Sequence, residues 1–433
     1  MAESVIKNYF PSQVVSDAEK LSYDYGLKVA KAIETEWFNN DNRGTRYDSN
    51  QNNFHELRLY ARGEQSIQKY KDELSINGDL SYLNLDWTPV PIIPKFVDIV
   101  VNGLAERMYD IKAYSVDPYG VSQRTEYMEA LLQDIEMKSF NDFVGNELGI
   151  DVSNSDQNTL PANEEELALH MQLTYKQATE IAQEQALNVL FEGNKYELIK
   201  KQFYYDLTVL GIGAVKTNFN TSEGVTISYV DPADLVYSYT ESPYFDDIYY
   251  VGEVKNVPVN ELAKQFPHLA HEDLEEITTN NNHHQNNYRH SSNYSNKIDI
   301  NKVQVLYFNY KTYMNEVYKV KEVGSGAEKA IEKDDTFNPP TEAADYSRLQ
   351  RSIETLYEGA LILGTNKLLK WEMEKNMLRP KSDFTKVKMP YAIVAPRMYN
   401  GKIESLVRRV TGFADMIQLT HLKLQQVLGR MVP

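Results

Sequence analysis

Gly211-Ile212-Gly213 has the glycine spacing of loops that cradle phosphates, and it is the first place to look for chemistry. A dinucleotide-binding fingerprint needs a strand before the glycines, a helix after them and a third glycine. Here a helical apolar pattern precedes them and a strand pattern follows. We therefore predict that they end a helix, where glycine takes a positive φ without steric cost. Gly213 is expected to be held by a positive φ or by tight packing.

Five histidines form a second group that could ligate a metal: His268, His271, His283, His284 and His290. The last three lie in the Asn-rich stretch 280–296, whose composition cannot bury a core. The chain contains no cysteine, and the histidines lack the spacing of a zinc site. We expect a solvated loop without a metal, with adventitious metal binding as the alternative.

Adjacent acidic residues at 246–247 and 275–276 could in principle be catalytic carboxylates. Catalysis by two carboxylates needs them about 5–10 Å apart across a substrate. Neighbours on a strand point to opposite faces, so Asp246 and Asp247 cannot converge. The sequence also lacks a GxSxG serine and a Walker A loop. We predict no catalytic residue, no cofactor and no enzymatic activity.

Basic residues gather near the C-terminus of an otherwise acidic chain, with Arg408, Arg409 and Lys423 as the candidates for contact with DNA or a channel. Lys and Arg number 45 against 62 Asp and Glu, a formal net charge of −17. A protein whose main task was to grip phosphates would be basic. Two interpretations of the basic residues stay open, a solvated helix face and a transient contact with a polyanion.

The composition sets further limits. A chain of 433 residues is long enough for two or three domains. The lack of cysteine excludes disulfides and is compatible with a reducing cytoplasm. No apolar run reaches the ~18 residues that span a bilayer, and the N-terminus lacks the apolar region of a signal peptide. The 31 tyrosines indicate either half-buried packing or extensive protein–protein interfaces.

The basic residues would be positioned by a helix predicted over residues 402–430. Its apolar residues recur at a near-heptad spacing, which suits a helix packed lengthwise against other helices. They are Ile403, Leu406, Val410, Phe413, Ile417, Leu424 and Leu428. We expect this stripe to contact the preceding elements and a neighbouring subunit, with Leu406, Val410, Phe413, Ile417 and Leu424 as the interface candidates.

The other elements follow from periodicity and from Gly and Pro positions. Helices are predicted over 16–38, 54–61, 66–74, 95–109, 124–143, 164–191, 196–210, 259–266 and 347–357. Strands are predicted over 111–116, 214–220, 225–230 and 245–254, a strand with a short connection within 360–371, and a hairpin within 303–320. Extended or irregular segments are predicted at 39–53, 77–79, 87–94, 117–120, 151–161, 324–344 and 389–396.

Three stretches resemble the portal proteins of tailed phages. Residues 90–118, VPIIPKFVDIVVNGLAERMYDIKAYSVDP, resemble an early helix of the portal wing and the short strand after it. Residues 198–239 resemble the wing segment in which a helix, a glycine turn, a hairpin and a Val-x-Pro corner recur. Residues 389–426 resemble the passage from the clip into the second stem helix. The likeness is to the portals of crAss-like phages, short-tailed phages of gut Bacteroides.

The resemblance implies an α+β portal fold with a helix-rich wing carrying β-hairpins, then stem helices and a small α/β clip. It implies a ring, typically of twelve copies, at one capsid vertex of the virion, assembled in the host cytoplasm. DNA would enter through the ring, driven by a terminase, and leave through it on infection. The implied partners are further copies, the major capsid protein, tail adaptor or connector proteins, terminase and, transiently, double-stranded DNA. No membrane is implied.

The implied domains are a helical part of the wing at 1–86, the wing at 87–300, wing and clip strands with an insertion at 301–400, and a stem helix leading towards the tunnel loop at 401–433. The C-terminal crown of the family is expected to be absent from this chain. Two rival functions remain, a virion-associated hydrolase that uses carboxylates and a scaffold or adaptor protein of the same particle.

Overall fold

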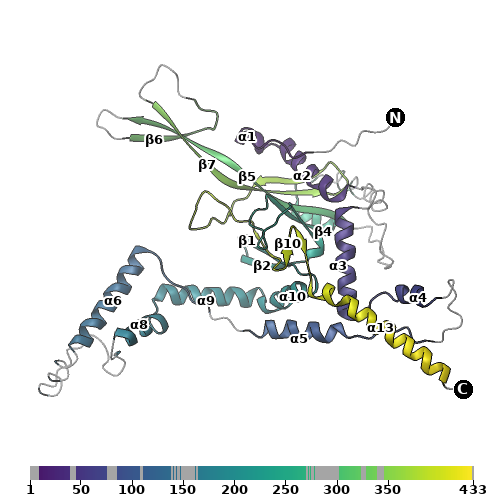
Figure 1. The fold of residues 1–433 in the computed structure, drawn as a ribbon. Coiled ribbons are helices and arrows are strands. Elements are labelled where there is room, and N and C mark those ends of the chain that lie inside the picture. The colour runs from purple at the N-terminus through teal and green to yellow at the C-terminus, as the bar shows by residue number, and fades with distance from the viewer. Residues whose placement is uncertain are drawn as a thin grey trace. The chain divides into compact units, whose positions relative to one another are not determined.

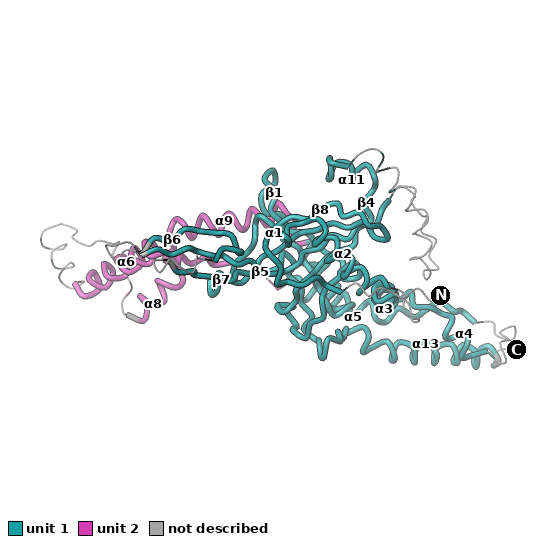
Figure 2. The backbone as a smooth tube through the Cα atoms, turned by 90° about the horizontal axis from the view of Figure 1, so that it is seen from above, with its two compact units in different colours: residues 1–106, 198–433 teal, residues 107–197 magenta. Residues whose placement is uncertain are grey.

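The computed structural model divides into two compact units, one of residues 1–106 with 198–433 and one of residues 107–197 (Figure 2). The fold is mixed α+β, as predicted. The expected domain boundaries at 86, 300 and 400 differ from these unit boundaries and stay predictions. The described residues are 9–39, 45–75, 85–107, 111–137, 161, 164–269, 302–322, 328–338 and 346–431, with single positions at 140, 143, 147, 272, 274 and 277. The Asn-rich stretch, the turn expected at 77–79 and most of the break expected at 151–161 lie outside them.

The first unit begins with helices α1 (Asp17–Lys20), α2 (Tyr23–Phe38), α3 (Arg46–Arg62), α4 (Gln68–Leu74) and α5 (Ile93–Ala105). The helix expected over 16–38 is therefore two helices. Ser16 caps the first by accepting from the N–H of Glu19, and Ser22 caps the second by accepting from the N–H of Tyr25. Each serine supplies an acceptor that the first turn of a helix lacks.

The prediction of an irregular segment over 39–53 is wrong for its second half. Residues 46–53 belong to α3, whose first turn is capped by Thr45 accepting from the N–H of Asp48 at 2.9 Å. The helix then continues for seventeen residues to Arg62. Its Asn and Ser content suggested a loop, but apolar residues further along the helix bury it in the core, and packing overrides weak propensity.

A central antiparallel sheet has the strand order β3-β4-β5-β7-β8, with β6 paired to the outer part of β5 (Figure 1). The strands are β3 (Leu235–Tyr237), β4 (Tyr250–Pro258), β5 (Lys302–Glu322), β6 (Glu328–Lys333), β7 (Tyr346–Ile362) and β8 (Leu368–Met373). The long pairing of β5 with β7 runs from Val305 opposite Ile362 to Lys321 opposite Tyr346.

Four predictions in this region are wrong. The expected hairpin at 303–320 is one continuous strand, because residues 305–321 pair without interruption with β7. Residues 347–357 form β7 and no helix, since pairing with β5 overrides their helix-favouring Arg, Gln and Glu. The segment expected to be irregular at 324–344 contains β6. The strand expected to start at Phe245 begins only at Tyr250. Phe245 itself has a φ of 57°, which is incompatible with a strand.

The segment resembling the portal wing has the predicted order of elements. Helix α10 (Tyr196–Val209) ends at Gly211, whose φ is 85°. Strands β1 (Gly213–Asn220) and β2 (Gly224–Val230) then form a hairpin, and β9 (Tyr391–Val394) pairs with the other edge of β1. Asp231 follows β2 and caps the short 3-10 helix η1 (Pro232–Asp234) before β3.

The buried core of the first unit brings distant segments together. One cluster joins Leu57 of α3 and Val97 of α5 to Ile212, Ala214 and the C-terminal Ala414. A second packs α2 against the sheet through residues such as Ile33, Trp37 and Phe308. A third places α11 (Val259–Gln265) on the same sheet. The C-terminal helix thus packs against the buried faces of α3 and α5.

The second unit contains helices α6 (Pro118–Glu136), α8 (Glu164–Leu173) and α9 (Ala178–Gly193), with a small core of Leu131, Leu167 and Met171. The strand predicted over 111–116 is wrong, and the turn predicted at 117–120 is the start of α6. Asp117 caps that helix by accepting from the N–H of Gly120. The run predicted over 164–191 is two helices, because the chain leaves helical geometry at 174–177 before α9.

Candidate subunit-interface helix

The last helix, α13 (Leu406–Met431), carries the residues predicted to form a subunit interface. The predicted start at residue 402 is wrong, because 402–403 form strand β11 (Lys402–Ile403), which pairs with β10 (Met398–Tyr399). Asn400 and Gly401 have φ of 48° and 71° and make the turn between them. The N–H of Arg408 donates to the hydroxyl of Ser405 at 2.9 Å, which caps the new helix.

One face of α13 packs against its own chain, and the sequence analysis missed it. Val407, Ala414, Gln418 and Leu422 are buried and recur at helical steps. The amide oxygen of Gln418 accepts from the N–H of Val90 at 2.8 Å, and its amide nitrogen donates to the carbonyl of Thr88 at 3.3 Å. A buried glutamine therefore ties the extended segment before α5 to the middle of α13.

Asp415 anchors the same helix to α3 and α4. Its Oδ1 accepts from the hydroxyls of Tyr60, at 2.9 Å, and Tyr70, at 2.6 Å, while Lys69 donates to Oδ2. Both tyrosine rings are buried. Burial first, and then the hydrogen bond to Asp415, raises the pKa of each tyrosine well above its usual value. Asp415 thus satisfies two buried hydroxyls and a lysine at one point.

The predicted interface stripe lies largely in solvent in the single chain. Phe413 is 62% exposed, Leu424 56% and Ile417 43%; Val410 is also exposed, while Leu406 is half-buried. Val427 and Met431 extend the stripe, so that 406, 410, 413, 417, 424, 427 and 431 follow one heptad register. A long apolar stripe that the described residues of its own chain leave uncovered is characteristic of an association surface.

The three basic candidates have separate surroundings. Arg409 makes an exposed ion pair with Glu404 at 2.5 Å, and its hydrogen bond to that carboxylate raises the pKa of Arg409. Arg408 donates to the amide oxygen of Asn53 on α3 at 2.7 Å. Lys423 is exposed further along the helix. The structure therefore does not gather them into one basic patch, and their contact with DNA stays a prediction.

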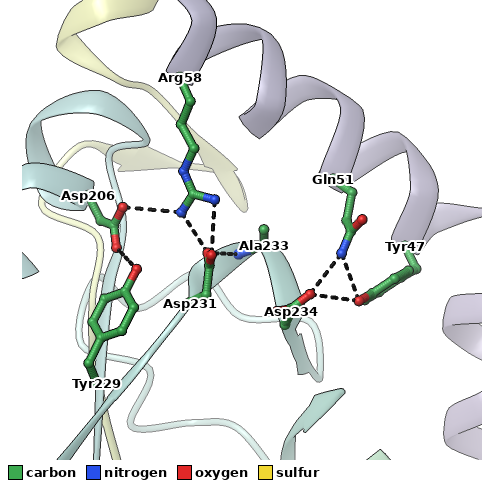
Figure 3. Close-up of polar contacts among 8 residues, drawn as sticks. All are labelled: Tyr47, Gln51, Arg58, Asp206, Tyr229, Asp231, Ala233 and Asp234. Carbon is green, nitrogen blue, oxygen red and sulfur yellow. Dashed lines mark hydrogen bonds and ion pairs between the residues drawn. The ribbon is translucent and has the colours of Figure 1, made fainter. Parts of the chain in front are cut away.

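A buried polar network holds α3, which supports α13, against the hairpin module (Figure 3). The guanidinium of Arg58 makes two hydrogen bonds to Asp231, at 2.6 and 3.0 Å, and a longer one to Asp206 at 3.3 Å. Tyr229 donates to the other oxygen of Asp206. Along the same face of α3, Gln51 and Tyr47 donate to Asp234.

The pKa of Asp206 is raised to about 6, because burial outweighs the hydrogen bond from Tyr229 and the charge of Arg58. A raised carboxyl pKa is a common mark of an active site. However, Asp206 is only 2% exposed and both its oxygens have protein partners. We interpret the network as the joint between α3, α10 and β2, since a substrate could not reach this carboxylate.

The clearest alternative site is a groove of about 480 Å³ between β1, α11 and the central sheet. Glu358 and Glu372 face each other across β7 and β8, and Lys370 pairs with both. The pKa of Glu372 is lowered by its hydrogen bond to Lys370, whereas that of nearby Glu374 is raised by burial and by Glu358. Carboxylates with opposite shifts could serve as acid and base, although Lys370 is paired with both of the carboxylates that line the groove.

The earlier chemical candidates find little support among the described residues. Asp247 accepts from the hydroxyl of Thr240 within the chain. Glu275, Glu276, His271, His283, His284 and His290 fall outside the described part. No group of three or more His, Asp or Glu suited to a metal occurs among the residues that were placed. No described helix is long and apolar enough to cross a membrane.

The chain has no match among protein-family models or curated proteins. The resemblance to portal proteins therefore rests on the sequence motifs and stays a prediction.

Proposed function

We propose that this chain is a portal subunit: it forms a ring at one capsid vertex through which genome DNA is packaged and ejected, and to which the tail attaches. The observation that carries the proposal is the heptad stripe of α13, which stays exposed while another face of the same helix is buried. An anchored helix with an uncovered apolar stripe is suited to lengthwise packing against a helix of another copy.

The remaining properties are compatible with this role. A net charge of −17 limits sticking of DNA to the protein, because like charges repel along a channel wall. Exposed basic residues of α13 such as Arg409 and Lys423 would make transient contacts with DNA. In this proposal the subunit works in the virion with capsid, tail adaptor and terminase proteins, and itself catalyses nothing.

The test compares neighbouring positions on α13. Phe413→Asp adds a charge to an exposed side chain, so the monomer should fold with unchanged stability while ring assembly is lost. Ala414→Asp, one residue on, buries a charge in the core and should unfold the first unit. Light scattering and negative-stain images report the assembly, and circular dichroism reports the fold.

The parent protein should scatter as a ring of many 49.9-kDa chains with a central hole. If Phe413→Asp forms rings as well as the parent does, the stripe is not part of the subunit interface. A monomeric parent that hydrolyses a polysaccharide or nucleic acid, and loses this activity in Glu374→Gln, would support the rival hydrolase. A monomer without activity would favour the scaffold or adaptor.

A further inference from the structure

A polar hollow of about 470 Å³ lies beside α13 in the first unit. Trp37 of α2 and Tyr237 of β3 form an aromatic wall, with their rings edge to face and 5.4 Å between centroids. Across from this wall, α3 presents one polar helical face made of Arg46, Ser49, Asn50 and Asn53. Arg408 of α13 also lines the space. The hollow thus combines two guanidinium groups with amide and hydroxyl groups.

Arg46 is held in place by two contacts. Its guanidinium lies over the ring of Trp37, 4.1 Å from the centroid, and donates to Glu36 at 2.8 Å. The ring contact and the ion pair together restrict how the group can turn. A guanidinium has five N–H donors, so Arg46 keeps donors for a further acceptor in the hollow.

Arg408 differs from the arginines around it. Arg409 pairs with Glu404, Arg46 with Glu36, and Arg58 with Asp231. Within the described part of the chain, the guanidinium of Arg408 meets only the neutral amide oxygen of Asn53. In a protein of net charge −17, a cation that faces a polar hollow with no carboxylate among its described lining residues is poised to receive one.

The hollow and the apolar stripe occupy different sides of α13. Arg408 and Val410 are two residues apart, which places them about 200° apart around the helix axis. The buried face, with Val407 and Ala414, lies between these two sides. In a ring of identical subunits each copy meets its neighbours through two different surfaces. In the proposed ring, the stripe and the hollow would therefore meet different neighbours.

We propose that the hollow receives a carboxylate-bearing segment of a second copy of this chain, bound between Arg408 and Arg46. The inference rests on the proposed ring and adds a polar contact that fixes the register of adjacent subunits. Guanidinium groups bind carboxylates with two parallel hydrogen bonds. The Asn50 and Asn53 amides and the Ser49 hydroxyl both donate and accept, which suits the peptide groups beside an acidic side chain. A phosphate would use donors alone.

The experiment compares Arg408→Gln with Arg409→Gln in the full chain. Both changes remove one positive charge from the same turn of α13, but only Arg408 lines the hollow. Arg408→Gln should raise the protein concentration for half-assembly by about tenfold or more, since it removes one of the two guanidinium partners of the incoming carboxylate. Arg409→Gln should change it less than about threefold, as expected for an exposed pair. Arg408→Lys should restore part of the loss.

Salt provides a second readout, because screening weakens an ionic contact. As the NaCl concentration rises, the half-assembly concentrations of the parent and Arg408→Gln should become more alike. The two monomers should have the same thermal unfolding temperature. If the parent forms rings and both variants assemble equally well, the inference fails and the proposed function stands. If Arg408→Gln assembles normally but loses affinity for duplex DNA, the ligand is a phosphate and the inference is overturned. A monomeric parent overturns both proposals.

Discussion

Arg408 and Arg409 are adjacent in the sequence, yet their side chains have unlike surroundings. Arg409 extends along the surface to Glu404, whereas Arg408 turns towards α3 and Asn53. Charge pattern alone could not separate them, because one step along a helix rotates a side chain by about 100°. The distinction depends on α3, whose first half was expected to be irregular. At the residue scale, function therefore follows from which neighbour each side chain reaches.

Two glycines that the sequence treated together have different constraints. Gly211 has a φ of 85°, and an added Cβ would lie 2.7 Å from the carbonyl oxygen of Glu404. Gly213 lacks a positive φ, and its added Cβ would meet the ring of Phe203 at 2.6 Å. Of the two expected constraints on Gly213, tight packing is the one present. Gly211 combines a left-handed backbone with a backbone contact that cannot swing aside.

We expect Gly211→Ala to lower the free energy of unfolding by roughly 2–4 kcal/mol, from left-handed strain and the clash with Glu404. Gly213→Ala should cost about 1 kcal/mol, because the half-buried ring of Phe203 can turn away. Urea unfolding followed by circular dichroism measures both. Gly412→Ala is the control, since nothing crowds that helical glycine and alanine favours a helix. A larger loss at 213 than at 211 would contradict this order.

At the element scale, local signals predicted some structures and missed others. Ser16, Gly211 and the heptad of α13 act within a few residues, so their elements could be read from the sequence. The long β5–β7 pairing could not, because β7 contains helix-favouring residues and gains its structure from a partner strand. The positions of the stripe were predicted from spacing alone, but its expected contact with the preceding elements is wrong, because a different face of α13 is buried against them. The anchor of α13 was not predicted, since Tyr70 and Asp415 are 345 residues apart.

The anchor of α13 leads to a prediction for Asp415. Asp415→Leu leaves the buried hydroxyls of Tyr60 and Tyr70 without their acceptor, so it should destabilise the first unit by about 3 kcal/mol. Asp415→Asn retains one acceptor oxygen and should cost clearly less. Urea unfolding of the monomer measures the stability. Adding Tyr60→Phe and Tyr70→Phe removes the stranded donors, so the triple variant should regain part of the loss. Purely additive effects would mean that the three groups do not interact.

At the scale of the whole molecule, the first unit is made of two segments that precede and follow the second unit in the sequence. Residues 1–106 and 198–433 share one core, so neither can form it alone. The sheet is tied to the N-terminus as well, because Lys20 donates to the carbonyl of Tyr313 and accepts at its own carbonyl from Trp371. Arg58 from residues 1–106 pairs with Asp206 and Asp231 from residues 198–433. This network is therefore a joint on which the stability of the unit depends.

The protonation of Asp206 should make that stability depend on pH. Its pKa is raised from 3.8 unfolded to about 6 in the folded chain, so between these values the folded state binds more protons. The stabilising contribution of this group is complete below about pH 4 and is lost as the pH rises through about 6. Asp206→Asn does not titrate. The variant should therefore gain stability relative to the parent, by roughly 1–3 kcal/mol, between pH 4 and pH 7.

Urea unfolding of both proteins across this pH range measures the difference in their free energies of unfolding. The other carboxylates titrate in both proteins, so their contributions cancel in this difference. Tyr229→Phe provides a directional check. It removes a hydrogen bond that lowers the pKa of Asp206, so in this variant the pH-linked loss should persist and move to higher pH. Parallel stability curves for the parent and Asp206→Asn would show that the carboxylate titrates alike in both states. Arg58 and Tyr229 would then compensate its burial fully, and the joint would not sense pH.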